Sequence, residues 1–485
     1  MATWDDRVRY FELMDKGDDG SNTGIATTAP CPADYEVGKS YWIEEYPIDF
    51  DCRSAPLPEE DVDVVVIGSG ITAAAVLHNL AEKRHDLKVA VVEARGICSG
   101  ATGRNGGHLC RAEGTELRNL VEELGFEEAV RLSNFGVRNR DLTLSAIDKL
   151  GIQDKVDLEL TGTRVVFASE EEKKTYLEEL DFAETHGLKF EGHYLKPEKL
   201  VEESNIALEM GQFGAASLDK SGTIFPRKLV AELLRDAIRR MPGLTIHPYN
   251  PVRSVDKISV QTSHGSAPSY TTTTDNGIIR SRAVVHATNA YASYLIPSLR
   301  NSNGVVGCKA ECIAVKPNVA PSGSSNPHGL RGGLGFDEFG HYIIQRPNNG
   351  PFIYGWSTCE KIGEYDDNTP LSCDENQKPA GQDVMTDLLE KGFPHSFGAV
   401  DLQRDVSHRW SGIQGFTKSG ASLVGRPSEE SPGEFMSVGH NGEGMGRCFA
   451  CATVMTDMLV HYLDGKKHDT WSRPDWFPES FLYGF

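Results

Sequence analysis

The sequence predicts an α/β protein of two interleaved domains, one with a parallel sheet covered by helices and one with mainly antiparallel strands. The segment DVDVVVIG, residues 61–68, is a run of apolar β-branched residues, as in a parallel strand that is buried on both faces. A glycine turn, a helical pattern and a second apolar strand follow and complete one βαβ unit. Between about residues 300 and 400, short β-rich segments alternate with Gly, Pro and Asn loops and indicate a second β-rich region.

Length, composition and charge limit the class of protein. A chain of 485 residues is too long for one small hydrophobic core, because domains have roughly 100–200 residues each. The formal net charge of −21 argues against a nucleic-acid partner, since proteins that bind phosphate backbones concentrate Lys and Arg. The ten cysteines are scattered, and Cys448 and Cys451 have no second pair at metal-binding spacing. We therefore expect buried thiols and no metal site.

Sequence patterns also bear on location. The first residues lack a basic region followed by an apolar run, and the final residues FLYGF differ from the peroxisomal address Ser-Lys-Leu. No stretch approaches the roughly 18 apolar residues of a membrane span. We expect a cytoplasmic protein without a membrane span.

The chain is expected to begin with an irregular arm over residues 1–60, rich in Gly, Pro, Asp and Thr around one aromatic patch, Tyr41-Trp42-Ile43. Regular structure starts at Asp61 with the first strand. A helix after Gly70 and a second strand over 87–94 complete the βαβ unit.

The turn after the first strand has a dinucleotide-binding pattern. Gly68-Ser69-Gly70-Ile71-Thr72-Ala73 has the form G-x-G-x-x-A between a buried strand and a helix. The first glycine permits a tight turn, the second lets the backbone approach a pyrophosphate, and the alanine keeps the helix close to the strand. Glu93, followed by Ala94 and Arg95, ends the second strand where a carboxylate binds ribose hydroxyls and disfavours a 2′-phosphate.

A nearly side-chain-free loop follows the ribose acid. It reads Cys98-Ser99-Gly100-Ala101-Thr102-Gly103-Arg104-Asn105-Gly106-Gly107-His108. Glycines there allow successive amides to point inward as an anion nest, while Ser99, Thr102 and Asn105 add short donors and Arg104 adds charge. We expect this loop to return to the same bound dinucleotide. The alternative is a flexible surface loop without a ligand.

The remaining elements are predicted from periodicity. Polar and amphipathic helices are expected over 170–187 and 227–243, the second with Leu229, Leu233 and Ile238 among its inward residues. Thr262–Gly277 is expected to form a hairpin or an exposed loop of low complexity. The other expected elements are strands at 244–247, 252–260 and 278–287, a helix near 382–391, and an apolar-faced helix over 447–463.

A second glycine-dense turn leads into that last helix. Gly439-His440-Asn441-Gly442-Glu443-Gly444-Met445 repeats the arrangement of glycines before a helix N-terminus. The two turns lie about 370 residues apart in the chain, and one long dinucleotide that spans both suits them better than a cofactor that docks and leaves. This predicts that Gly70 and Gly444 share one cleft. An ordinary glycine loop is the alternative.

These residues resemble the FAD-dependent amine and amino-acid oxidoreductases of the D-amino acid oxidase/sarcosine oxidase superfamily, most closely a fungal gamma-glutamylputrescine oxidoreductase-like branch. The resemblance rests on the run Gly100–Gly107 after the ribose acid, on Ser40-Tyr41-Trp42 and on the C-terminal glycine turn. Further motifs that are similar to the superfamily are Pro251–Val255 with Val252 facing the adenine, Val284–Tyr291 with Thr288 and Asn289, Tyr342–Pro347, Ile353–Trp356 and Trp410–Ile413 with Gly412.

The resemblance implies a Rossmann-type FAD-binding domain interleaved with an antiparallel-sheet substrate domain. The implied FAD-binding parts are 61–160, 216–300 and 401–485, the last with the C-terminal tail, and the implied substrate-domain parts are 161–215 and 301–400. The implied reaction oxidises a C–N bond by hydride transfer from carbon to flavin N5, followed by hydrolysis of the imine and electron transfer to O2 or another acceptor. A hydroxylase, a nicotinamide-dependent reductase and a non-catalytic flavin protein are the alternatives.

Departures from the superfamily pattern concern attachment and substrate. Gln414 stands where sarcosine oxidases carry the flavin-linking cysteine and near the carboxylate-clamping arginine of D-amino acid oxidases, so non-covalent FAD and an amine without a free α-carboxylate are expected. Arg346 or Arg409 would be an alternative clamp. The resemblance suggests an active-site role for Tyr342 and an oxygen-activating role for Lys361, while His108 and Trp356 are candidates to contact the flavin. A packing role is the alternative for Tyr342, His108 and Trp356.

Overall fold

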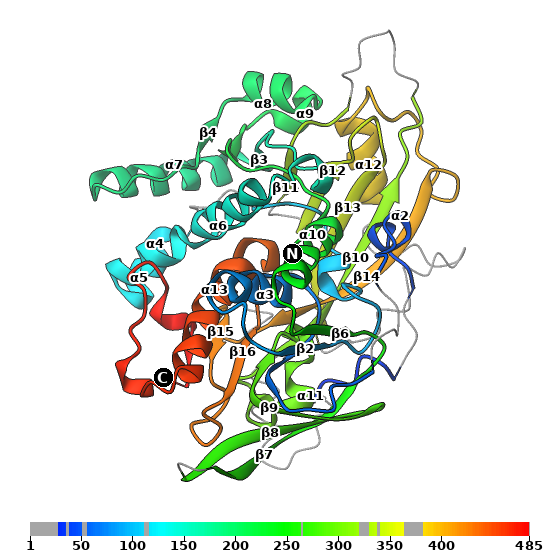
Figure 1. The fold of residues 1–485 in the computed structure, drawn as a ribbon. Helices are drawn as coiled ribbons and strands as arrows, with labels where there is room; N and C mark the ends of the chain where they lie inside the picture. The colour runs from blue at the N-terminus through cyan, green and yellow to red at the C-terminus, as the bar shows by residue number, and fades with distance from the viewer. Residues whose placement is uncertain are drawn as a thin grey trace, which may run out of the picture.

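The computed structural model describes residues 28–34, 38–50, 56–110, 116–262, 265–319, 329–336, 340–362 and 382–484. Within these residues the chain forms two large β-sheets with helices packed around them (Figure 1). The mixed α/β class predicted from the sequence is confirmed. Most of the expected N-terminal arm lies outside the described residues. Its aromatic patch falls on a short helix, α2, at Tyr41–Glu45.

The first sheet contains the predicted βαβ unit. Strand β1 pairs in parallel with β2 on one side and β9 on the other, and β9 pairs in parallel with β16. The β1 positions Val64, Val65 and Val66 are fully buried, in keeping with an apolar β-branched strand at the sheet centre. The strands of this sheet are β1 Val62–Ile67, β2 Val89–Val92, β6 Leu244–His247, β7 Val252–Thr262, β8 Gly265–Thr274, β9 Gly277–His286, β15 Leu423–Gly425, β16 Glu434–Val438 and β17 Leu482–Tyr483.

Strands β7, β8 and β9 form an antiparallel extension of this sheet, visible at the bottom of Figure 1. The expected hairpin is present, because β7 pairs with β8 over nearly its full length. The low-complexity threonine run Thr271–Thr274 therefore belongs to a strand and not to a loop. Threonine suits this place because its branched side chain favours extended backbone.

Three helices cover the central strands: α3 at Ile71–Lys83, α10 at Pro226–Arg240 and α13 at Gly444–Leu463. Helix α3 packs against both α10 and α13, and α13 also packs against α6 at Phe135–Leu150. The expectation for Ile238 was wrong, since this residue is 40% exposed while Ala237 is fully buried. The place of a residue around the helix axis, and not its hydrophobicity alone, decides whether its side chain faces the sheet.

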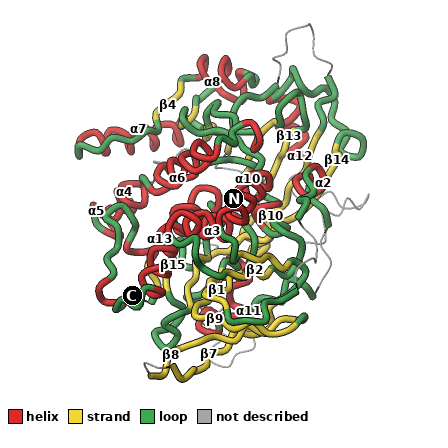
Figure 2. The backbone as a smooth tube through the Cα atoms, viewed as in Figure 1, coloured by secondary structure: helices red, strands yellow, loops and turns green. Residues whose placement is uncertain are grey.

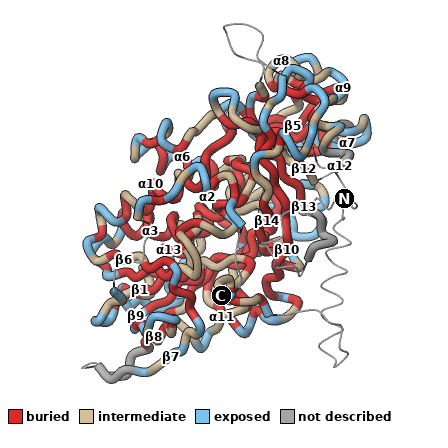
Figure 3. Tube along the Cα trace, turned by 90° about the vertical axis from the view of Figure 1, so that its right-hand side faces the viewer, coloured by how far each residue is buried: buried red, intermediate tan, exposed pale blue. Residues whose placement is uncertain are grey.

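The second sheet carries the predicted antiparallel strands. Strand β10 pairs antiparallel with β13 and β14, and all of its residues are buried (Figure 3). Figure 2 shows this sheet beside the helices of the upper half of the molecule. Its strands are β3 Thr163–Val166, β4 His193–Leu195, β5 Ala215–Leu218, β10 Val306–Val315, β11 Gly333–Phe336, β12 His341–Gln345, β13 Phe352–Ile362 and β14 Val406–Phe416.

The two faces of the second sheet bury different side chains. Ile313, Ile343, Phe352 and Trp356 pack in a cluster with α12 at Gln382–Gly392. Alternate residues on the opposite face join Trp42 and Phe225 in another cluster. The remaining helices are α4 Leu117–Leu124, α5 Phe126–Ser133, α7 Glu170–Thr185, α8 Pro197–Ser204, α9 Leu208–Gly211 and α11 Ala292–Leu295. Within the described chain, no helix combines the length and the apolar character needed to cross a membrane.

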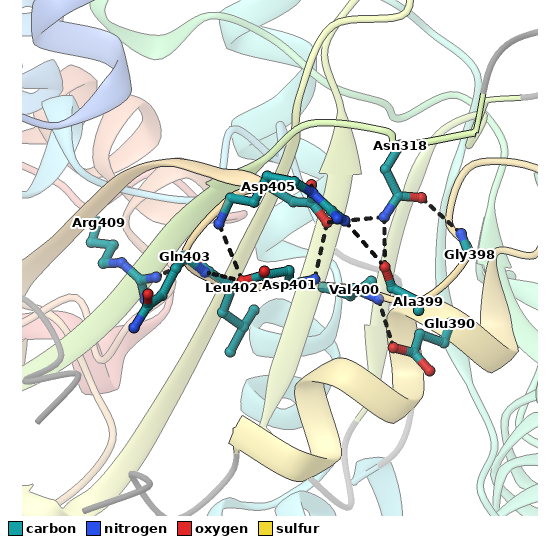
Figure 4. Close-up of polar contacts among 11 residues, drawn as sticks. Asn318, Glu390, Gly398, Ala399, Val400, Asp401, Leu402, Gln403, Asp405 and Arg409 are labelled. Carbon is teal, nitrogen blue, oxygen red and sulfur yellow. Dashed lines mark hydrogen bonds and ion pairs between the residues drawn. The ribbon is translucent and has the colours of Figure 1, made fainter. Parts of the chain in front are cut away.

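Strand β14 lies just after residue 400, where the last FAD-binding part, 401–485, is expected to begin. The strand pairs with β10 along its length and so belongs to the second sheet. The turn that leads into β14 is fixed by Asp405, whose carboxylate accepts from the side chains of Arg404 and Asn318 and from the N–H of Asp401 (Figure 4). These charge-assisted bonds lower the pKa of Asp405. The chain returns to the first sheet at β15.

Candidate functional site

A cavity of about 690 Å³ runs between the two sheets and brings the two glycine turns together. Gly70 and Gly444 both line it, although they lie at opposite ends of the sequence, so the predicted shared cleft is present. The other predicted positions that line it are Gly68, Ile71, Thr72, Glu93, Ala94, Arg95, Gly100, Ala101, Thr102, Arg104, Asn105, Gly106, Gly107, His108, Val252, Thr288, Asn289, Tyr342, Gly412, Gln414, Asn441, Gly442 and Met445.

The turn after β1 is closed against the end of β9. Gly68 has φ +104°, and a Cβ there would lie 2.6 Å from the carbonyl oxygen of Ala287, so only glycine fits. Helix α3 starts at Ile71 with no side chain capping its N-terminus. The Ile71 N–H donates to Thr102 Oγ1 over 3.1 Å, which ties the helix start to the loop after β2. Ala73 is fully buried and does not line the cavity, in agreement with its predicted packing role.

The carboxylate of Glu93 is held at the end of β2. One oxygen accepts from Ser69 Oγ over 2.6 Å and the other from the Arg95 N–H over 2.9 Å. Ser69 Oγ accepts in turn from the Cys98 N–H, so the ribose acid, the glycine turn and the following loop are linked. Each carboxylate oxygen keeps a further lone pair for a ribose hydroxyl.

Arg104 has a different role from the one its charge suggested. Its guanidinium donates to three backbone carbonyls, those of Ser99 (2.7 Å), Ser411 (2.9 Å) and Gly38 (2.6 Å). The charge therefore braces the loop against β14 and the N-terminal segment. Ser99 does not line the cavity, and its carbonyl serves this brace.

Two asparagine side chains hold the C-terminal glycine turn in place through hydrogen bonds. Asn289 Oδ1 accepts from the Gly439 N–H over 3.0 Å, and Asn441 Oδ1 accepts from the Thr417 N–H over 2.9 Å. Gly439 has φ +71° and supports the turn from outside the cavity lining. Helix α13 also begins without a side-chain cap, so its first N–H groups open on the cavity.

The lining fits a dinucleotide in three respects. Thr288 Oγ1 is buried at the cavity without a hydrogen-bond partner among the described residues. At Gly442 and Gly444, a Cβ would meet no protein atom closer than 3.5 Å, so these glycines leave room on the cavity side that packing within the chain does not require. The two uncapped helix N-termini supply partial positive charge for the anionic parts.

Tyr342, on β12, lines the cavity beside Gly106, and this part of the cavity is called the Tyr342 end. Its ring fits between Gly106 and Gly355, and a Cβ on either glycine would overlap it. Its hydroxyl lies 3.4 Å from Cys312 Sγ, and burial raises the pKa of Tyr342 well above its ordinary value. The ring of His108 stands edge-on to it, with 5.9 Å between ring centroids. Both side chains line the cavity, whereas the alternative for each was packing alone.

One further candidate, Trp356, does not reach the cavity. Trp356 packs with His341 and Tyr354 on the opposite face of the sheet, because it alternates with Gly355 along β13. Trp356 therefore has a packing role, which was the alternative to contact with the flavin. The side chain of Lys361 lies outside the described part of the chain.

Neither alternative carboxylate clamp lines the cavity. Arg346 pairs with Asp157 over 2.6 Å and stacks on Trp42, with its guanidinium carbon 5.1 Å from the indole centroid. Arg409 donates to the Leu402 carbonyl in the loop before β14 (Figure 4).

Some residues of the site escaped prediction. Asn139 on α6 is fully buried, donates to the Met445 carbonyl over 2.7 Å and accepts from the Ala450 N–H over 2.9 Å, so it fixes the start of α13. An asparagine inside an apolar helix face was the available signal. The described residues contain no cluster of three or more His, Cys, Asp or Glu that would hold a metal ion.

A parallel sheet with a glycine cradle, a ribose carboxylate and a second uncapped helix at the same cavity defines a dinucleotide-dependent oxidoreductase. The chain belongs to the FAD dependent oxidoreductase family, whose model matches residues 63–458. FAD is therefore its cofactor, and the chain is an enzyme of this oxidoreductase family.

Relatives of known name support the same family. Glycine oxidase from Geobacillus kaustophilus is 24% identical over 386 residues, which cover 79% of this chain and 89% of that protein. Its crystal structure has a TM-score of 0.62 at 21% identity, covering 84% of this chain and 95% of that one. L-proline dehydrogenase from P. horikoshii also has a TM-score of 0.62, at 20% identity and with 85% and 95% of the two chains covered. These structures share the fold with this chain.

Proposed function

We propose that this enzyme oxidises a C–N bond of an amine or amino-acid derivative. FAD, when bound, supplies a hydride acceptor at N5, and the electrons pass on to O2 or another acceptor. The imine that is left is hydrolysed by water. The observation that carries the proposal is that both glycine turns and Tyr342 line the same cavity.

The residues at the Tyr342 end suit binding and orientation better than acid–base catalysis. Tyr342 stays protonated at neutral pH because burial raises its pKa, so its hydroxyl can donate a hydrogen bond to a substrate. Gly106 and Gly355 hold the ring in one place. The protein thus positions the substrate and excludes water, while the hydride transfer relies on the cofactor.

The charges around the cavity favour an amine without a free carboxylate. Arg95, Arg104 and Arg164 are the arginines among the described lining residues. Arg104 braces backbone carbonyls, Arg164 pairs with Glu203, and Arg95 lies beside Tyr291 near the ribose acid. None of these three is placed to clamp a substrate carboxylate at the Tyr342 end. A neutral amide, a secondary amine or a polyamine therefore suits the site better than the amino acids in the names of the relatives.

Three finer points complete the proposal. FAD is held without a covalent bond, since Gln414 occupies the place of the linking cysteine. The run Gly100–Gly107 supports membership of the gamma-glutamylputrescine oxidoreductase-like branch. The enzyme works in the cytoplasm. Acid precipitation tests the first point, because non-covalent FAD stays in the supernatant.

An anaerobic titration tests the reaction. The purified protein, loaded with FAD, is mixed with secondary amines, polyamines and amine amides, and with glycine and L-proline as carboxylate-bearing controls. We expect bleaching of the flavin band near 450 nm by an amine without a carboxylate, and the product amine or aldehyde in equal amount. Bleaching by NADPH alone, or by no amine while dithionite still bleaches the flavin, would contradict the proposal.

A further inference from the structure

Three consecutive carbonyls of the loop after β2 are each bound by a side chain from outside the loop. Ser40 Oγ donates to the Gly103 carbonyl over 2.5 Å. The indole of Trp410 donates to the Arg104 carbonyl, and that of Trp42 to the Asn105 carbonyl, both over 2.7 Å. Both tryptophans are buried, at 2% and 0% exposure. The loop backbone is therefore fixed by donors from α2 and β14.

A trans peptide directs its carbonyl and the following N–H to opposite sides. The bond from Trp410 therefore turns the Asn105 N–H away from that indole, and the bond from Trp42 does the same for the Gly106 N–H. Asn105 and Gly106 both line the cavity. Within the described part of the chain, neither N–H donates to a protein acceptor. Two successive amide donors are thus left for a ligand.

These donors lie at the Tyr342 end of the cavity, because Gly106 touches the Tyr342 ring. The Trp42 indole is itself held by an edge contact with Phe225 at 4.8 Å and by the Arg346 guanidinium at 5.1 Å. Arg346 is in turn paired with Asp157. Such a rigid support keeps a donor oriented when charge develops near it.

We infer that Trp42 and Trp410 are positioning residues that aim the N–H groups of Asn105 and Gly106 at the ring of the bound FAD and favour its reduced, more negative form. The inference rests on FAD binding in this cavity and not on which amine is oxidised. Backbone donors that face developing negative charge stabilise it, so they raise the reduction potential.

The test compares Trp42→Phe and Trp410→Phe, which keep an aromatic ring and remove the N–H. We measure the midpoint potential of the FAD-loaded protein against a reference dye, together with the Kd for FAD. The preference for reduced flavin is expected to fall about tenfold in each variant, which equals about 30 mV for a two-electron couple.

Two controls separate amide orientation from loose packing. Ser40→Ala removes the hydroxyl that donates to the Gly103 carbonyl of the same loop. The N–H of the same peptide, that of Arg104, already donates to the Ala101 carbonyl over 3.1 Å and is therefore not available to a ligand. Its potential is expected to stay at the wild-type value. Trp476→Phe makes the same substitution where the ring stacks on Phe135, outside the cavity lining, and is also expected to leave the potential unchanged.

Folded variants whose potentials match those of the two controls would overturn the inference, and so would a change in the Kd for FAD without a change in potential. If Trp42→Phe does not fold, as judged by circular dichroism, Trp410→Phe decides alone, because its ring lies on β14 and not on α2. A wild-type protein that takes up no FAD would contradict the proposed function instead, before any potential is measured.

Discussion

Replacing Gly106 with alanine tests how tightly the Tyr342 end of the cavity is packed. A Cβ at Gly106 would lie 2.5 Å from Tyr342 Cδ2 and 3.4 Å from His108 Cδ2. Carbon atoms prefer a separation of about 3.5–4.0 Å, so the ring must move by about 1 Å. Gly355 borders the ring as well, which limits its retreat. Gly106 has no positive φ, so the cost is steric and not conformational.

Overpacking of this kind costs about 1–3 kcal/mol of the free energy of unfolding. Urea unfolding of FAD-free protein, followed by circular dichroism, measures it in a double-mutant cycle with Tyr342→Ala. In the Tyr342→Ala background, the cost of Gly106→Ala should fall below about 0.5 kcal/mol, because the clash is gone. Gly100→Ala is the matched control, since its Cβ would meet only Arg95 Nη2 at 3.9 Å. An equal cost of Gly106→Ala in both backgrounds would refute the reasoning.

Three further substitutions test other parts of the site. Arg104→Ala should lower the free energy of unfolding by about 3–5 kcal/mol and weaken FAD binding, because three backbone carbonyls lose a charged donor. An equally stable variant in urea would contradict this. Trp356→Phe should leave the Kd for FAD unchanged, as fluorescence titration can show, since this ring faces away from the cavity. Burial lowers the pKa of His440 to about 3, so the unfolded chain binds more protons between pH 3 and 6.5 and stability falls as the pH drops below about 6.5. His440→Gln should remove about 1–2 kcal/mol of the loss between pH 6.5 and 5 in urea titrations; an unchanged loss would show that His440 does not titrate this way.

The parts of the site that local sequence dictates were predictable. Gly68 and Gly70 follow a buried strand, and only a tight turn and a close approach explain both glycines. The shared cleft of Gly70 and Gly444 was also predicted, because two turns with the same chemistry suit two parts of one long ligand.

Roles that depend on distant partners were not predictable. The charge of Arg104 suggested an anion ligand, but its acceptors include Ser411, which the fold brings from 307 positions away. Because side chains alternate along β13, Trp356 and Gly355 face opposite sides of the sheet. Only the packing of the sheet decides which of these sides meets the cavity. The pairing of β14 with β10 was not predictable for the same reason, since it is a long-range choice.

The protonation states at the Tyr342 end constrain how a C–H bond can break there. An efficient general base has a pKa near the working pH. Tyr342 is far above that range, so at neutral pH it is a protonated phenol. Its pKa is not poised for proton abstraction from carbon. The proposed transfer of hydrogen with its electrons to the cofactor needs no such base. We therefore expect its pH dependence to follow the amine of the substrate, which must be unprotonated to react.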